Sequence, residues 1–317
     1  MNTNYKTNKT DRQSLRQQAI RKKEAELKKR TFFDPTYDVV FKKIFEKPKT
    51  LIHFLNAILH FDDEHKIISI ENLKPTVKLS SLTTKQKTAR FDIHARTMDG
   101  RFIDIEMQRA SHEDFLDRIE LYSSLLTINA KITLDNEISK KERTEHPYRM
   151  PTVYSIWICN FNVDFCKDYR EEFALFRLSD LKKSKPLPVY TKKNYIVIDL
   201  TKYVSRKSNS LENEWIELFK KMPTANRIPK GKDEVLEDVY ERMRVRNSAS
   251  TFITEVAADM VTKEEVSTRL GTARREGEAA AKAEAAKTNA ARDKKIAKYL
   301  RSIGVSPECV ATALAIK

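Results

Sequence analysis

The pattern of hydrophobic and polar positions divides the chain into a polar beginning, a long middle part and a helical end. In the middle part, segments with the two-residue period of strands alternate with segments of helical period up to about residue 250, which predicts an α/β domain. The expected strands lie at about 66–79, 89–97, 101–108, 152–160, 173–178 and 194–200. The expected helices begin near residues 34, 51, 111, 211 and 233.

Two helices are expected at the start of this domain. Asp34-Pro35 or Thr36 can open the first of them, because these residues favour the beginning of a helix. After the strands, Ser111 with Asp114 three residues later predicts the opening of a long helix. The apolar positions of the first two helices are Val40, Phe41, Ile44, Phe45, Leu51, Leu55, Ile58 and Leu59.

The two ends of the chain differ from this domain, which we place at residues 32–250. Residues 1–31 hold ten Lys or Arg against three Asp or Glu and few apolar residues, which indicates a basic N-terminal arm. A disordered extension with weak phosphate contacts is the favoured form of this arm, and a frayed helix on DNA or a solvated leader are the alternatives.

Residues 251–317 predict an exposed helical spacer followed by a two-helix tail. Gly304 is expected to end one helix and Ser306-Pro307 to begin the next. This tail could be a helix-turn-helix DNA reader, but a module for packing or self-association is favoured, which makes a homo-oligomer through this region possible.

Composition restricts the classes of function. The formal net charge of +15 favours a polyanionic partner, with nucleic acid as the first choice and a merely soluble basic surface as the alternative. The sequence has no apolar run long enough to span a membrane and no secretory signal, so we expect a cytoplasmic protein without a membrane partner. The three cysteines lack the paired spacing of a zinc site. With only five glycines, the chain has no glycine-rich phosphate loop, which argues against a nucleotide-driven motor or a dehydrogenase. It also has no G-x-S-x-G motif, which argues against a serine hydrolase of that kind.

The segment ARFDIHARTMDGRFIDIEMQRA predicts a hairpin of two alternating strands. A three-residue loop ending in Gly100 at positive φ sets Thr97 opposite Arg101, and the same register sets Asp92 opposite Glu106. A two-residue loop would send one of the two carboxylates toward the core, so burial favours the three-residue loop.

The two faces of this hairpin differ in chemistry. Like charges opposite each other are destabilising by roughly 0.2–1 kcal/mol when solvated, so the pair of Asp92 and Glu106 would gain from a cation such as Mg²⁺, with Asp104 as an auxiliary ligand. Periodicity alone favours a simpler interpretation, in which the polar face is only solvated. The expected core face holds Phe91, Ile93, Ala95, Ile103, Ile105 and Met107. The polar face holds Arg90, Asp92, His94, Arg96, Asp104, Glu106 and Gln108, with Phe102 as an apolar exception.

In several places the chain resembles the PD-(D/E)xK nuclease family transposases, also called recombination-promoting nucleases. The resemblance spans about residues 34–317 and leaves out the basic arm. It rests on the segments DPTYDVVFKKIF, LIHFLNAIL, FDIHA, FIDIEMQ and DRIELYSSLL and on the tail from TARREGE to IAKYLRSIGVSPECV. This resemblance implies a restriction-endonuclease-like core, a mixed central sheet flanked by helices, and cleavage of DNA with Mg²⁺ or Mn²⁺.

The resemblance also assigns residues to roles. Asp92 matches the metal-binding aspartate, Glu106 matches the acidic residue, and Gln108 stands where the wider superfamily has Lys. Gln can orient a water but cannot stabilise negative charge as Lys does. Gln is usual in this family, and so it is no evidence of inactivity.

Three further residues are expected to support the site. Arg118 and Tyr122 lie at helical spacing, and Arg118 could contact a phosphate or form a structural bond to the sheet. Asp38 matches a family position and could approach the metal, or could serve as a partner for the helix dipole. A lone His94 makes neither a metal cluster nor a triad and is expected to make a surface hydrogen bond.

These features give one leading hypothesis and one rival. The leading hypothesis is a Mg²⁺-dependent deoxyribonuclease that cuts DNA and is linked to recombination or mobile elements. The rival is a nuclease fold whose chemistry has faded, leaving a DNA-binding or assembly protein. A helical interaction protein driven by the tail is a remote third.

Overall fold

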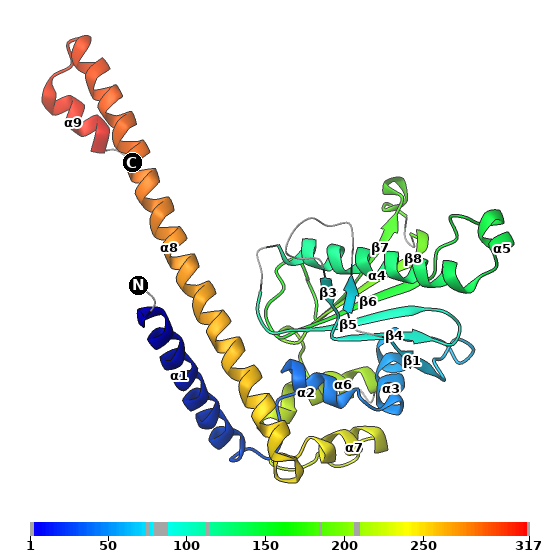
Figure 1. The fold of residues 1–317 in the computed structure, drawn as a ribbon. Helices are drawn as coiled ribbons and strands as arrows, with labels where there is room; N and C mark the ends of the chain where they lie inside the picture. Colours follow the sequence, from blue (N-terminus) through cyan, green and yellow to red (C-terminus); the bar gives the residue numbers. More distant parts are fainter. Residues whose placement is uncertain are drawn as a thin grey trace. The chain divides into compact units, whose positions relative to one another are not determined.

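The computed structural model describes residues 3–73, 76–78, 88–111, 114–183, 186–205 and 210–315 (Figure 1). The chain divides into two compact units, Met1–Val261 and Thr262–Lys317. All strands lie in the first unit, which also contains the predicted hairpin.

Six strands of the first unit form a mixed sheet in the order β1-β4-β5-β6-β8-β7. β5 and β8 each run parallel to β6, whereas the other neighbouring pairs are antiparallel. The strands are β1 (Ile70–Asn72), β4 (Ile93–Thr97), β5 (Phe102–Gln108), β6 (Val153–Cys159), β7 (Arg170–Phe176) and β8 (Pro188–Asp199). A separate pair is formed by β2 (Thr76–Lys78) and β3 (Thr88–Arg90).

Helices cover both faces of this sheet (Figure 1). On one face lie α2 (Asp38–Ile44), α3 (Pro48–Leu59), α6 (Leu211–Lys221) and α7 (Glu234–Arg242), and on the other lies α4 (Phe115–Glu137). The short elements are α5 (Lys140–Glu145) and the 3₁₀ turns Leu178–Asp180, Met222–Thr224 and Val245–Asn247. The mixed sheet with flanking helices confirms the predicted α/β, restriction-endonuclease-like architecture.

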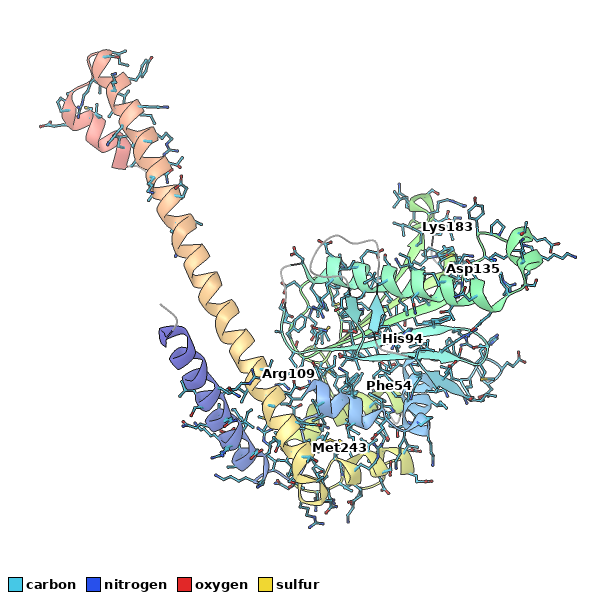
Figure 2. The ribbon with its side chains drawn as sticks, in the orientation of Figure 1. Phe54, His94, Arg109, Asp135, Lys183 and Met243 are labelled. Atoms are coloured by element: carbon cyan, nitrogen blue, oxygen red, sulfur yellow. The ribbon has the colours of Figure 1, made fainter. Side chains whose placement is uncertain are left out.

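Each face of the sheet has its own hydrophobic core. The larger core joins Ile105 of β5 to Phe41 of α2, Phe54 of α3 and Trp215 of α6 (Phe54 is labelled in Figure 2). The apolar stripes expected on α2 and α3 point into it: seven of their eight predicted positions are buried, and Leu59 is partly buried. Because each fully buried side chain contributes about 1.5–3 kcal/mol, these stripes fix the two helices against the sheet.

The second core lies under α4 and corrects one sequence prediction. Phe91 does not share a face with Ile93 but packs with Phe102 and with Leu126 of α4. The reason is that β4 begins only at Ile93. Phe91 precedes the strand, so its side chain does not follow the alternation of side chains between the two faces of the sheet. Phe102, expected to be an apolar exception on a polar face, is part of this core.

The helices α2 and α4 begin later than the sequence predicts. Tyr37 precedes α2 without a side-chain cap, and Asp34 instead accepts hydrogen bonds from the backbone and hydroxyl of Thr36. Asp114, not Ser111, precedes α4, again without a side-chain cap. Both openings are therefore set by tertiary packing rather than by a local capping box.

The N-terminal arm is helical: α1 spans Thr3–Leu27. Leu27 is buried and joins the larger core, and Glu24 accepts a hydrogen bond of 2.5 Å from Thr254. The favoured prediction of a disordered extension was therefore wrong, because a few contacts at the end of α1 attach a segment whose composition is otherwise that of a solvated helix.

The helix α8 (Ser250–Ser302) begins in the first unit and continues into the second. Its first turns contribute Val256, Ala257 and Met260 to the larger core. In the second unit, Gly304 has a φ of +86° and precedes α9 (Pro307–Ala315), which confirms the predicted stop and start. Among the residues searched, no helix combines the length and the apolarity needed to cross a bilayer.

Candidate active site

The hairpin of β4 and β5 has the register that its turn predicts. Thr97 donates its backbone N–H to Arg101 at 2.9 Å, and Gly100 has a φ of +83°. The ladder pairs Ile93 with Ile105, and this confirms the three-residue loop.

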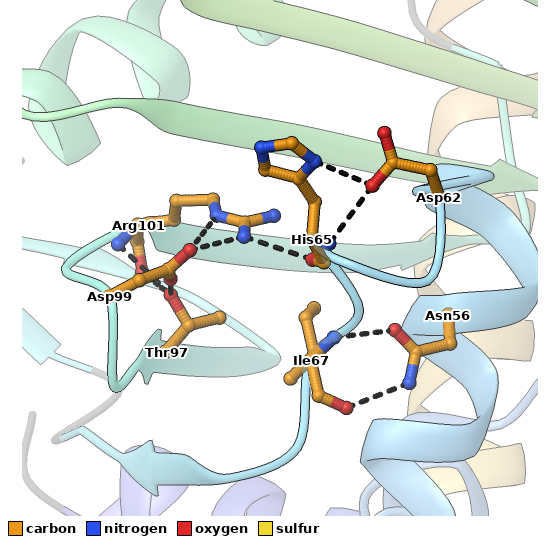
Figure 3. A network of polar contacts seen from close by, with 7 residues as sticks. All are labelled: Asn56, Asp62, His65, Ile67, Thr97, Asp99 and Arg101. Atoms are coloured by element: carbon orange, nitrogen blue, oxygen red, sulfur yellow. Dashed lines mark hydrogen bonds and ion pairs between the residues drawn. The ribbon is translucent and has the colours of Figure 1, made fainter.

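Side chains reinforce the turn (Figure 3). Asp99 accepts hydrogen bonds from Thr97 and from the guanidinium of Arg101, and Arg101 also donates to the backbone carbonyl of His65 at 3.0 Å. These contacts fix the distal end of the hairpin, so the register is held at the end opposite to Asp92.

Asp92 and Glu106 meet at the other end of the hairpin. The backbone N–H of Asp92 donates to Glu106 Oε1 at 3.1 Å, and the backbone N–H of Met107 donates to Asp92 Oδ2 at 3.1 Å. Glu106 thus accepts a hydrogen bond from the backbone of Asp92, and Asp92 accepts one from the residue that follows Glu106. The two acids predicted to face each other do so.

The polar face of the hairpin is not solvated. His94 (labelled in Figure 2), Asp104 and Glu106 are 3%, 0% and 2% exposed, because α4 covers this side of the sheet. The same row continues into β6, where Ser155 lies beside Asp104 and Trp157 beside Glu106. The interpretation of a simply wet face is therefore wrong, and the acids lie in a setting where charge is costly.

Burial governs the protonation of these acids. It raises the pKa of Glu106 well above its usual value, and the negative charge of Asp92 raises it further, whereas Arg118 and Lys42 oppose the shift. The pKa of Asp104 is also raised well above its usual value, first by burial and then by the charges of Glu106 and Asp92. A side-chain hydrogen bond with Glu106 raises the pKa of Asp104 further, because it favours the protonated form.

Lys42 is part of this site although the sequence did not single it out. Its Nζ lies 2.8 Å from Asp92 Oδ1, and its side chain is 34% exposed. A clue was present in the helical spacing, because Lys42 follows Asp38 by one turn on α2 and lies between the buried positions of that helix. That spacing gives no indication of which distant acid the side chain reaches.

Gln108 and Arg118 surround the acidic pair. Gln108 Nε2 donates to Glu106 Oε2 at 3.3 Å. Arg118 donates to the hydroxyl of Tyr122 at 3.4 Å, and its guanidinium lies 4.9 Å from the centre of the Tyr122 ring. Burial raises the pKa of Tyr122, so this hydroxyl stays protonated and can donate a hydrogen bond.

A polar latch joins the end of β5 to the start of α2. Arg109 donates to Asp34 Oδ2 at 3.1 Å and to the hydroxyl of Thr36, and its guanidinium lies 3.8 Å from the centre of the Tyr37 ring. Arg109 (labelled in Figure 2) follows Gln108 directly, so the latch joins the end of β5 to the segment that leads into α2, whose first turn holds Asp38.

The donor set suits a hard cation better than a soft one. Among the described residues searched, no group of three or more His, Cys, Asp or Glu side chains comes together as a complete cage. Two facing carboxylates, of which the Asp92 side chain is 11% exposed, suit Mg²⁺, since it is commonly held by one or two carboxylates together with waters and substrate oxygens. The mutual repulsion that raises the pKa of Glu106 is what a divalent cation would relieve.

Comparison with protein-family models finds a match to the family described as PD-(D/E)XK nuclease family transposase, over residues 35–263. Comparison with curated proteins finds no match, and comparison with solved structures also finds none. The matched residues include the whole six-stranded sheet and every residue of the acidic site.

Proposed function

The chain belongs to the PD-(D/E)XK nuclease family transposases, and from this membership and the acidic pair we propose a metal-dependent endonuclease that hydrolyses DNA phosphodiesters and takes part in recombination. The observation that carries this proposal is the position of Asp92 and Glu106, which face each other at the end of the hairpin. Lys42 pairs with Asp92, but the pKa of Glu106 stays raised by burial and by the charge of Asp92 in spite of it, so a further cation would still stabilise the ionised pair.

In this proposal, Asp92 and Glu106 hold Mg²⁺ or Mn²⁺, which would supply Lewis-acid stabilisation of the phosphate and a water of lowered pKa. Asp104 precedes Glu106 by two residues and lies on the same face of β5. Because Asp104 has no exposed surface, it serves as an auxiliary acid rather than as a main ligand. The formal charge of +15 favours association with the polyanionic substrate.

The remaining residues act on water and phosphate. Gln108 holds the attacking water through its side-chain amide, and the guanidinium of Arg118 binds a phosphate oxygen. Tyr122 positions Arg118 through the contact between hydroxyl and guanidinium. In the reaction, the water oxygen bonds to phosphorus and releases one proton to solvent, one P–O ester bond breaks, and the leaving oxygen takes up a proton from solvent, so that a phosphate monoester and a hydroxyl end result.

A second candidate is a DNA-binding or assembly protein that keeps the fold without the chemistry. The observation in its favour is Gln108, because an amide cannot supply the positive charge that a lysine would place beside the reacting water. Both candidates predict salt-dependent DNA binding, and only the first predicts cleavage.

The deciding experiment incubates purified full-length protein with supercoiled plasmid and Mg²⁺, beside the variants Asp92→Asn and Glu106→Ala. We expect nicking by the wild type, loss of nicking in both variants, and DNA binding retained by all three. Equal nicking by all three proteins would identify a contaminant, and binding without any nicking would favour the assembly protein.

A further inference from the structure

We propose that Lys42, on helix α2, is the catalytic lysine of this site and supplies the positive charge that Gln108 cannot supply from β5. This inference rests on the proposed nuclease function and extends it by one residue. It assigns to Lys42 a direct contact with the reacting water or the scissile phosphate.

The position of Lys42 is the first argument. Its Nζ lies 2.8 Å from Asp92 Oδ1, and its charge also opposes the rise in the pKa of Glu106. The same carboxylate pair is touched from β5 by Gln108, whose Nε2 lies 3.3 Å from Glu106 Oε2. The amide of Gln108 therefore contacts Glu106, and the ammonium of Lys42 contacts Asp92, the other acid of the pair.

Solvent access is the second argument. The side chain of Lys42 is 34% exposed, whereas that of Asp92 is 11% exposed. The Lys42 side chain is therefore only partly covered by its surroundings, which leaves it accessible to a substrate. A lysine is a compact charge with three donors, so it can keep one hydrogen bond to Asp92 and direct another at a phosphate oxygen or a water.

The attachment of α2 is the third argument. The latch of Arg109, Asp34 and Tyr37 joins the strand that carries Glu106 and Gln108 to the helix that carries Lys42. On its other side α2 is held by the buried Phe41 and Ile44. The lysine is thus carried by a rigid element, as a group that acts on a transition state requires.

Four variants test this proposal: Lys42→Met, Lys42→Gln in case the first fails to fold, Gln108→Lys, and the double variant Lys42→Met with Gln108→Lys. Lys43→Met is the matched control, because Lys43 lies on the same helix, is 45% exposed and pairs with Glu46 at 2.6 Å. Plasmid nicking is measured at saturating Mg²⁺, and binding of Ca²⁺ to the metal-free proteins is measured by calorimetry.

A catalytic lysine predicts a pattern that a merely structural one does not. We expect Lys42→Met to lower the nicking rate by about 100-fold or more, as loss of a charge-stabilising donor does, and Lys43→Met to leave it unchanged. Ca²⁺ should bind Lys42→Met roughly tenfold more tightly, because the cation no longer competes with an ammonium for Asp92. The double variant should recover at least about tenfold of the lost rate, since Lys at position 108 reaches the same acids.

Two results would overturn the role of Lys42 while leaving the nuclease intact: Lys42→Met nicking at the wild-type rate, or a loss of rate matched by an equal loss of Ca²⁺ affinity. If the wild type fails to nick but binds Ca²⁺ through Asp92, the nuclease proposal itself fails, and the role of Lys42 fails with it.

Discussion

Asp104→Asn should stabilise the metal-free protein at alkaline pH. Asp104 is fully buried on β5, and a side-chain hydrogen bond with Glu106 favours its protonated form. Its neighbour Glu106 is also buried, so two acids and the nearby Asp92 share one poorly hydrated region. Asparagine keeps the shape of the side chain and removes the charge.

The sign follows from the direction of the pKa shift. The pKa of Asp104 is raised on folding, so between about pH 4 and this raised pKa the native state binds more protons than the unfolded state. The free energy of unfolding therefore falls as pH rises through this window, by up to about 1.4 kcal/mol per pH unit for each group that titrates. Above the raised pKa the full cost of the buried charge remains.

Removal of this titrating group should raise the free energy of unfolding at pH 8 by at least about 1.4 kcal/mol, the free energy equivalent of one pKa unit. At pH 4, where the unfolded carboxyl is about half protonated, the variant and the wild type should differ much less. Glu106 still titrates in the variant, so the fall with pH should become shallower rather than vanish.

The assay is urea denaturation of the metal-free protein from pH 4 to 9, with Asp63→Asn as the control. The side chain of Asp63 is 92% exposed, so its replacement should change the free energy of unfolding by less than about 0.5 kcal/mol. An Asp104→Asn protein that is less stable than the wild type at pH 8, or equally dependent on pH, would refute a costly buried charge at this position.

Three other variants test the fold around the site. Gly100→Ala should lower the free energy of unfolding by about 1 kcal/mol in urea denaturation, because a φ of +83° strains any residue with a Cβ. No atom lies within 4 Å of the added Cβ, so a clash would not contribute, and a neutral effect would argue against this turn. Arg109→Ala should lower the free energy of unfolding by about 1–3 kcal/mol by opening the latch, and nicking should fall in the same preparation; unchanged nicking would show that α2 keeps its position without it. Leu27→Ala should cost about 2–5 kcal/mol, whereas Leu15→Ala at a 64% exposed position should be nearly neutral, and equal effects on thermal unfolding would mean that α1 is not anchored.

Much of the site was determined by the sequence alone, because the deciding interactions are local. The turn at Gly100 fixes the hairpin register within a few residues, and this register brings Asp92 and Glu106 together. The apolar stripes of α2 and α3 likewise follow from helical spacing. The roles of Asp92, Glu106, Gln108, Arg118, Tyr122 and Asp38 in catalysis stay predictions, as do DNA binding and self-association through the C-terminal helices.

Only the tertiary structure decided which helix covers the polar face of the hairpin and which basic side chain pairs with its acids. The two-residue period separates the faces of a strand but contains no information about a helix packed on either of them, so the burial of Asp104 under α4 could not be predicted. Lys42 lies fifty residues before Asp92 in the numbering, and their ion pair depends on how α2 packs against the sheet. Local patterns thus determined the elements and their registers, whereas long-range packing decided the burial and charge that set the chemistry.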